Sequence, residues 1–127
     1  MLYVQDRTGS EEANPNPELE NVEEMLNREM VKRYGSTVQV EPLHYELLLW
    51  HNEDTDTFSF GLKNLKKKPA AFTLDCSSSR NVIFNEIGGK VTRYVKSGEF
   101  IFMQHVEVSG EDIEEFTVQY VVVVEEI

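Results

Sequence analysis

Residues 44–64 read HYELLLWHNEDTDTFSFGLKN, and this stretch decides the fold class. Apolar side chains stand at every second position from Tyr45 to Leu49 and again from Phe58 to Leu62. A period of two is that of a β-strand with one buried face. Two such runs, joined by the polar segment 52–56, predict an antiparallel hairpin.

The same pattern continues to the end of the chain. Besides residues 44–51 and 56–64, strands are expected at 37–40, 71–76, 82–86, 90–95, 99–108 and 115–124. Turn-forming pairs such as Gly88-Gly89 and Ser97-Gly98 separate them. About eight short strands without alternating helices predict an all-β protein, an antiparallel β-sandwich, and argue against a doubly wound α/β fold.

The alternating apolar positions also predict the core. In residues 99–108 we place Phe100, Phe102 and Val106 on one face, and in residues 115–124 we place Phe116 with Val118 and Tyr120. The expected core comprises Leu47, Leu49, Phe58, Phe60, Leu62, Phe72, Leu74, Phe100, Phe102, Val106, Phe116, Val118 and Tyr120.

Three parts are expected along the chain: a flexible tail or linker at 1–16, an amphipathic helix at 17–35 and a sandwich domain at 36–127. Asn16 can cap the helix, Pro17 suits its first position and Gly35 suits its end. An apolar stripe is expected to pack on the domain that follows, or alternatively on a partner. It consists of Leu19, Val22, Met25, Leu26, Met30 and Tyr34.

The chain of 127 residues is acidic, with a formal charge of −11. This charge argues against a general nucleic-acid binder, and no apolar run is long enough to predict a transmembrane segment. Residues 1–10 lack the features of a signal peptide, so we expect a cytoplasmic protein. The charge is segregated, because residues 62–96 carry eight basic and two acidic groups whereas residues 97–127 carry eight acidic and no basic groups.

The basic block is the first candidate site. If folding gathers its cations, they form a patch for an acidic protein partner or for anionic lipid; otherwise they are solvated loops and outer strand faces. The residues concerned are Lys66, Lys67, Lys68, Arg80, Lys90, Arg93 and Lys96.

The acidic loop at residues 52–56 is the second candidate. It begins like an EF-hand, but Thr57 stands where glycine is needed and Lys63 where glutamate is needed, so an EF-hand is rejected. A sandwich-type Ca²⁺ site remains a hypothesis, with a solvated hairpin loop as the alternative. Its ligands would be Glu53, Asp54, Asp56, Glu111 and Asp112.

Cys76 is the only thiol of the chain. A nucleophilic cysteine needs a base such as histidine beside it, and His44 and His51 bracket one strand about 23 Å apart. We therefore interpret Cys76 as a buried structural thiol and expect no catalytic residues and no cofactor.

Three short strings carry a family resemblance: Leu62-Lys63-Asn64-Leu65, Phe72-Thr73-Leu74-Asp75-Cys76 and Ser79-Arg80-Asn81-Val82. Over about residues 56–108 the chain resembles the non-catalytic C2-like β-sandwich module of calpains, closest to the C-terminal module of the small-optic-lobes type. The resemblance implies an accessory domain that regulates, scaffolds or targets a protease.

Our first hypothesis is therefore a non-enzymatic regulatory or protein-interaction module. The alternative is a C2-like targeting domain that binds Ca²⁺ or anionic lipid, and a third hypothesis is a hydrolase that uses Cys76.

Overall fold

The computed structural model describes residues 17–109 and 115–126, so the predicted tail at 1–16 lies outside the described residues. One helix precedes eight strands, and a short 3-10 turn at Ile87–Gly89 leads into the sixth strand. The elements are α1 (Pro17–Tyr34), β1 (Ser36–Glu41), β2 (Tyr45–Asn52), β3 (Thr57–Asn64), β4 (Ala70–Asp75), β5 (Val82–Phe84), β6 (Lys90–Val95), β7 (Phe100–Val108) and β8 (Val121–Glu126).

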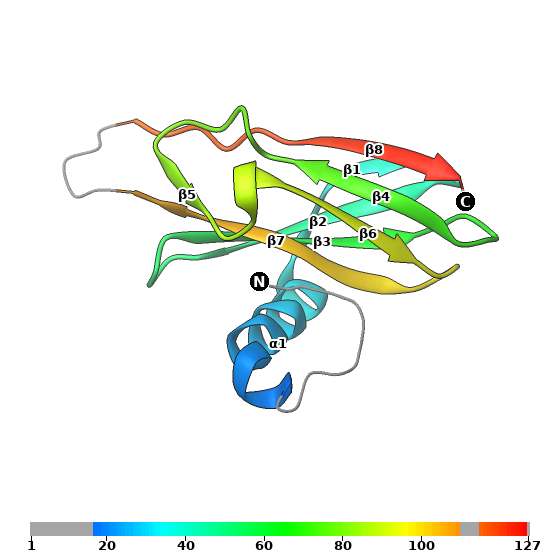
Figure 1. The fold of residues 1–127 in the computed structure, drawn as a ribbon, viewed down its shortest axis with the longest axis horizontal. Helices are drawn as coiled ribbons and strands as arrows, with labels where there is room; N and C mark the ends of the chain where they lie inside the picture. Colours follow the sequence, from blue (N-terminus) through cyan, green and yellow to red (C-terminus); the bar gives the residue numbers. More distant parts are fainter. Residues whose placement is uncertain (1–16, 110–114, 127) are drawn as a thin grey trace.

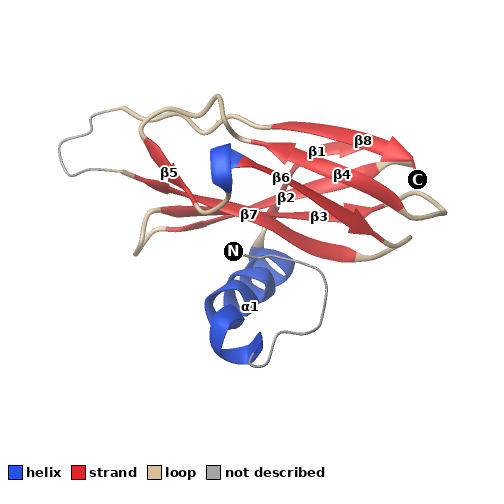
Figure 2. Ribbon diagram, viewed as in Figure 1, coloured by secondary structure: helices blue, strands red, loops and turns tan. Residues whose placement is uncertain are grey.

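The strands form two antiparallel sheets that face each other (Figures 1 and 2). One sheet has the order β1-β2-β3-β7-β5, and the other has the order β6-β4-β8. The quoted hairpin pairs β2 with β3 in an unbroken register from Tyr45–Asn64 to Asn52–Thr57. The predicted all-β fold with one N-terminal helix is confirmed.

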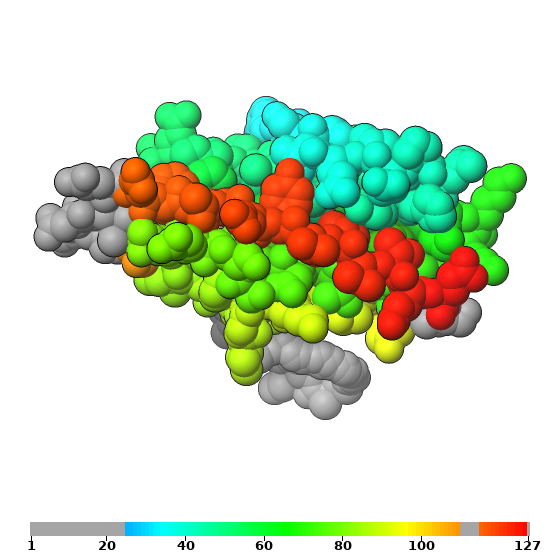
Figure 3. Space-filling model, turned by 90° about the horizontal axis from the view of Figure 1, so that it is seen from above, coloured from blue at the N-terminus to red at the C-terminus, as the bar shows by residue number. Residues whose placement is uncertain are grey.

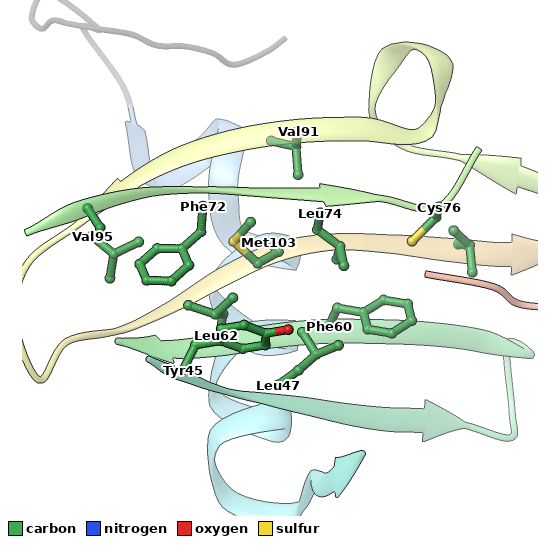
Figure 4. Packing of buried hydrophobic residues seen from close by; sticks show 12 residues of the cluster. Tyr45, Leu47, Phe60, Leu62, Phe72, Leu74, Cys76, Val91, Val95 and Met103 are labelled. Atoms are coloured by element: carbon green, nitrogen blue, oxygen red, sulfur yellow. The ribbon is translucent and has the colours of Figure 1, made fainter. Parts of the chain in front are cut away.

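The core lies between the two sheets (Figure 4). The Tyr45 and Phe72 rings, one from each sheet, meet edge to face with their centroids 6.1 Å apart. Each large side chain buried here contributes about 1.5–3 kcal/mol through transfer from water. The buried cluster comprises Tyr45, Leu47, Phe60, Leu62, Ala70, Phe72, Leu74, Cys76, Val91, Val95, Met103 and Val106.

A β-bulge in β7 corrects part of the predicted core. Phe60 pairs with Gln104 and Gly61 pairs with Phe102, so Met103 is an extra residue that shifts the alternation. Phe102 is only 3% exposed, yet it does not belong to the cluster between the sheets that contains Val106. The prediction that Phe100 and Phe102 share a face with Val106 is therefore wrong.

Helix α1 packs on the outer face of the five-stranded sheet, where Gly61 leaves room for it (Figure 1). A Cβ atom at Gly61 would lie 3.0 Å from Val31 Cγ1 and would overlap the Phe100 ring. Val31 is fully buried, whereas Leu26 of the predicted stripe is 61% exposed. The helix therefore does pack on the sandwich, but through Val31, which lies beside the predicted stripe.

The last strand also differs from its prediction. Residues 115–120 form one isolated bridge, Arg80–Thr117, and regular pairing with β4 begins only at Val121. Phe116 is 39% exposed, so its prediction as a core residue is wrong, while Val118 and Tyr120 do pack against the core. The strand at the edge of the smaller sheet is thus Val121–Glu126.

Candidate protein-interaction surface

The lysine turn between β3 and β4 is held by the buried side chain of Asn64. Its Nδ2 donates to the carbonyl oxygens of Lys68 (3.1 Å) and Val95 (2.9 Å), and its Oδ1 accepts from the Lys66 N–H (2.8 Å). Its backbone also bonds the β6–β7 turn, since the Asn64 N–H donates to Glu99 O and the Gly98 N–H donates to Asn64 O. Every strong hydrogen-bonding group of the amide is thereby used, and the turn has one defined backbone path.

Two lysines of this turn form ion pairs with the end of β8. Glu126 lies 3.2 Å from Lys66 Nζ and 3.4 Å from Lys68 Nζ. Both lysines lower the pKa of the Glu126 carboxyl, through hydrogen bonds first and charge second. Lys67 is exposed at the tip of the turn. The predicted basic turn therefore exists, but two of its three charges are directed toward the protein's own C-terminal strand.

Arg93 is directed into the fold and away from any surface patch. Its guanidinium donates to the carbonyl oxygens of Phe102 and Met103 at the β7 bulge, and it pairs with Glu86 at 3.3 Å. β5 pairs with β7 only at Val106–Val108, and Arg93 donates to the Phe102 and Met103 carbonyls from the facing sheet.

The other predicted cations are not gathered into one patch. Lys90 begins β6 and Lys96 follows its last residue, so the two lysines lie about 20 Å apart along the chain. Lys90 pairs in register with Asp75, and Arg80 is exposed and forms the isolated bridge with Thr117. Only Lys66, Lys67, Lys68 and Lys96 lie near the same end of the sandwich, where Ser97 Oγ donates to Lys66 O.

The acidic loop has the geometry of a closed hairpin. Asn52 Oδ1 accepts from the Asp54 N–H, Asp56 Oδ1 lies 2.9 Å from His51 Nε2, and Glu53 is exposed. Among the described residues, no three His, Cys, Asp or Glu side chains are placed to hold a metal ion together. Glu111 and Asp112 of the hypothesised Ca²⁺ site lie outside the described residues.

Cys76 is fully buried in the core, and its N–H donates to Gly89 O. Burial, followed by the charge of Asp75, raises the pKa of the thiol to about 12. The thiolate, which is the reactive form, is therefore scarce at neutral pH. These observations agree with a structural role for this side chain.

Four strands end the two sheets, and three of them carry features that discourage pairing with another chain. β1 has a bulge at Val38, β5 has only three residues, and β6 carries Lys90 and Arg93. β8 differs from all of these. Its six residues pair with β4 without a register shift, and the strand reads VVVVEE, with no proline and no lysine.

The free edge of β8 exposes apolar side chains along one side of the sandwich. Val121 and Val123 point to the outer face of the smaller sheet, where Val123 is 48% exposed. In Figures 1 and 3, β8 (red) runs beside β1 (cyan), the edge strand of the other sheet. The unpaired edge of such a strand presents a row of backbone N–H and C=O groups to a partner.

The sequence pattern did not predict this edge. It placed the last strand at 115–124, so that the alternation of Phe116, Val118 and Tyr120 defined its faces. The sequence signal for this edge strand is the unbroken run Val121–Val124, because valine has a high β propensity. The only charged residues of the strand, Glu125 and Glu126, follow this run. Asn64, the centre of the lysine turn, was also not singled out as a structural residue.

Comparisons with protein-family models, curated proteins and solved structures find no match for this chain. Among the described residues, no helix has both the length and the apolar character needed to span a membrane. The calpain resemblance therefore stays a prediction from the three short strings.

Proposed function

We propose that the chain is a non-enzymatic protein-interaction module that binds an extended segment of a partner protein as an additional strand on β8. The observation that carries this proposal is the regular, six-residue edge of β8 with its exposed valines. Strand addition is a common mode of peptide recognition, in which backbone hydrogen bonds supply affinity and alternate side chains supply specificity.

Both ends of β8 are held in place, which favours binding. At its C-terminal end Glu126 is paired with Lys66 and Lys68. Before its N-terminal end, the Gln119 N–H donates to Ser79 Oγ at 2.8 Å, and Ser79 Oγ donates to Gln119 O at 3.1 Å. A pre-ordered edge loses less conformational entropy on binding than a flexible one.

The exposed valines add side-chain contacts to the backbone ladder. A strand beside β8 places alternate side chains opposite Val121 and Val123, and each apolar cross-strand pair contributes about 0.2–1 kcal/mol. Each backbone hydrogen bond to the added strand makes a net contribution of about 0.5–1.5 kcal/mol to the binding free energy.

The test uses two matched variants on two edges of the same protein. Val123 of β8 is 48% exposed and Val40 of β1 is 49% exposed, so V123K and V40K change the same residue type at equal exposure. A phage-displayed library of short peptides is selected on the wild-type chain, and each recovered peptide is then measured on both variants. We expect the peptides to lose binding to V123K, because a lysine on an edge strand opposes pairing, and to keep binding to V40K.

Amide hydrogen exchange locates the contact. With a selected peptide bound, the amides of Val121–Glu126 should exchange more slowly, while those of β1 should not change. Recovery of peptides that bind V123K and wild type equally, or of no binding peptide at all, would refute the proposal.

A further inference from the structure

Resting on the proposed function, we infer that the strand accepted by β8 is β8 of a second copy of this chain, paired antiparallel about a two-fold axis at Val123. The smaller sheets of the two copies then join into one continuous sheet, in which neither β8 is an edge any longer. A two-fold contact uses the same surface of both copies, so the strand has to be complementary to itself.

The first argument is that β8 is apolar on both of its faces. On the outer face, Val121 is 59% and Val123 is 48% exposed. On the inner face, Val122 and Val124 are partly buried against the core. An unbroken apolar run is typical of a strand that is covered on both faces, whereas a strand with one solvated face alternates. A strand that fits this edge therefore carries apolar side chains on both faces, and β8 of a second copy is such a strand.

The second argument is that β8 lacks the features that keep like edge strands apart. Lysine, proline, a bulge or a short length prevents many edge strands from pairing with copies of themselves. β1, β5 and β6 each carry one of these features, whereas β8 carries none. Because a second copy presents the same regular edge, the two edges satisfy each other's free backbone groups when they meet.

The register follows from the position of Glu125 near the end of the strand. Directly opposite residues of an antiparallel pair lie on the same face, so the two-fold axis lies at a residue and not between two. With the axis at Val123, the Glu125 side chain faces Val121 of the second copy. The two Glu125 carboxylates are then about 13 Å apart along the strand, farther than the Debye length of about 8 Å at physiological salt. With the axis at Val124 this separation falls to about 7 Å, and in parallel pairing the carboxylates become neighbours.

The net charge of the chain weakens this contact without excluding it. Two copies with a formal charge of −11 each repel, and salt screens that repulsion. At the edge itself, Glu126 is paired with Lys66 and Lys68 of its own copy. An apolar contact between like-charged molecules therefore strengthens as salt is added, whereas a contact held by opposite charges weakens.

The test measures the oligomeric state of the full chain by sedimentation velocity from about 1 µM to about 1 mM, at low and at physiological salt. Because one strand pair is a small contact, we expect a monomer that dimerises toward the upper end of this range, and more readily at physiological salt. Amide hydrogen exchange at Val121–Glu126 should slow as the concentration rises. Exchange in β6, at the other edge of the same sheet, should not change.

Two lysine variants in the exposed row of β8 test the register. V123K places two introduced lysines against each other at the axis, and like charges directly opposite oppose pairing. V121K places its lysine opposite Glu125 of the second copy, where opposite charges favour pairing. We expect V123K to weaken dimerisation by at least about tenfold, and V121K to dimerise at least about fivefold more tightly than V123K. The control is I83K, since Ile83 is 55% exposed on β5, at the far edge of the other sheet, and this variant should dimerise as the wild type does.

The outcomes separate this inference from the proposed function. If the chain stays monomeric throughout while library peptides bind in a V123K-sensitive way, strand addition stands and the second copy is overturned as the occupant. A dimer that V123K leaves intact, or that V121K and V123K weaken equally, also overturns the inference. If the chain is monomeric and no library peptide is sensitive to V123K, the proposed function itself fails.

Discussion

Asn64→Asp replaces the amide that organises the lysine turn by a carboxyl of nearly the same shape. The amide nitrogen donates to two carbonyl oxygens, those of Lys68 and Val95, and Asn64 is fully buried. An ionised carboxylate oxygen in this position can donate to neither and faces both at hydrogen-bond distance. The Oδ1 contact from the Lys66 N–H is kept, so the substitution isolates the two donated bonds.

The expected loss follows from those two bonds. Each contributes about 0.5–1.5 kcal/mol, and each buried acceptor left without a donor costs about 1–3 kcal/mol. Because the backbone can relax and admit water, we expect a total loss of about 3–5 kcal/mol at neutral pH, or a melting temperature lower by about 10–20 °C. Faster amide exchange should be confined at first to residues 65–68.

The penalty should also depend on pH, with a definite sign. Burial and two facing carbonyl oxygens favour the protonated carboxyl, so its pKa in the folded variant lies above its unfolded value. The penalty is then largest above the folded pKa and shrinks as the pH falls toward the unfolded value of about 3.9, because the protonated group regains one donor.

Asn85→Asp is the matched control. Asn85 is exposed, and its Oδ1 accepts from the His105 N–H at 2.8 Å, a contact that aspartate keeps. We expect the free energy of unfolding of Asn85→Asp to lie within about 0.5 kcal/mol of the wild-type value. Urea denaturation at several pH values measures both variants. Equal penalties for the two, or an Asn64→Asp penalty that does not vary with pH, would refute the role assigned to the buried amide.

Three further predictions concern the packing of α1 on the sheet, the reactivity of the Cys76 thiol and the ion pairs of Glu126 in β8. Gly61→Ala should lower stability by about 1–3 kcal/mol and speed amide exchange in α1, because the new methyl overlaps the Phe100 ring; unchanged exchange in the helix would contradict the packing. Cys76 should react with iodoacetamide at pH 8 about a hundredfold more slowly in the folded chain than in urea, since it is buried with a pKa of about 12; similar rates would show an accessible thiol. Lys66 and Lys68 hold the pKa of Glu126 below its ordinary value, so the stabilising effect of Glu126 is present above its unfolded pKa and is lost as the pH falls through the folded pKa. The melting temperatures of wild type and E126Q should therefore differ at pH 7 and converge as the pH falls through the lowered pKa of Glu126, and a constant difference would contradict the ion pairs.

Periodicity alone predicted most of the fold. The hairpin of residues 44–64 has the register that its alternation requires, and each expected strand has a counterpart in the structure. Periodicity failed at Met103, because a bulge inserts one residue without a sequence signal and reverses the faces before and after it. It also failed for residues 115–120, where alternation outside the regular strand resembles that of a strand.

The candidate surface was less predictable than the fold. The three consecutive lysines, Lys66, Lys67 and Lys68, indicate a basic turn. Its ion pair between Lys66 and Glu126 joins residues 60 positions apart, which no local pattern reveals. The edge position of β8 depends on the order of strands in the sheet, and alternation fixes the faces of a strand without fixing its neighbours.

The charge segregation along the chain acquires a physical meaning from these contacts. Arg93 of the basic block spans the two sheets to reach the β7 bulge, and Lys66 and Lys68 hold the end of β8. Arg93, Lys66 and Lys68 thus make contacts within the sandwich, whereas Lys67, Lys68 and Lys96 stay exposed at one end of it. Because the lysine turn lies at the end of β8, the one regular free edge of the described sheets carries charges of both signs there, and its exposed valines are the feature that distinguishes it from the other three edges.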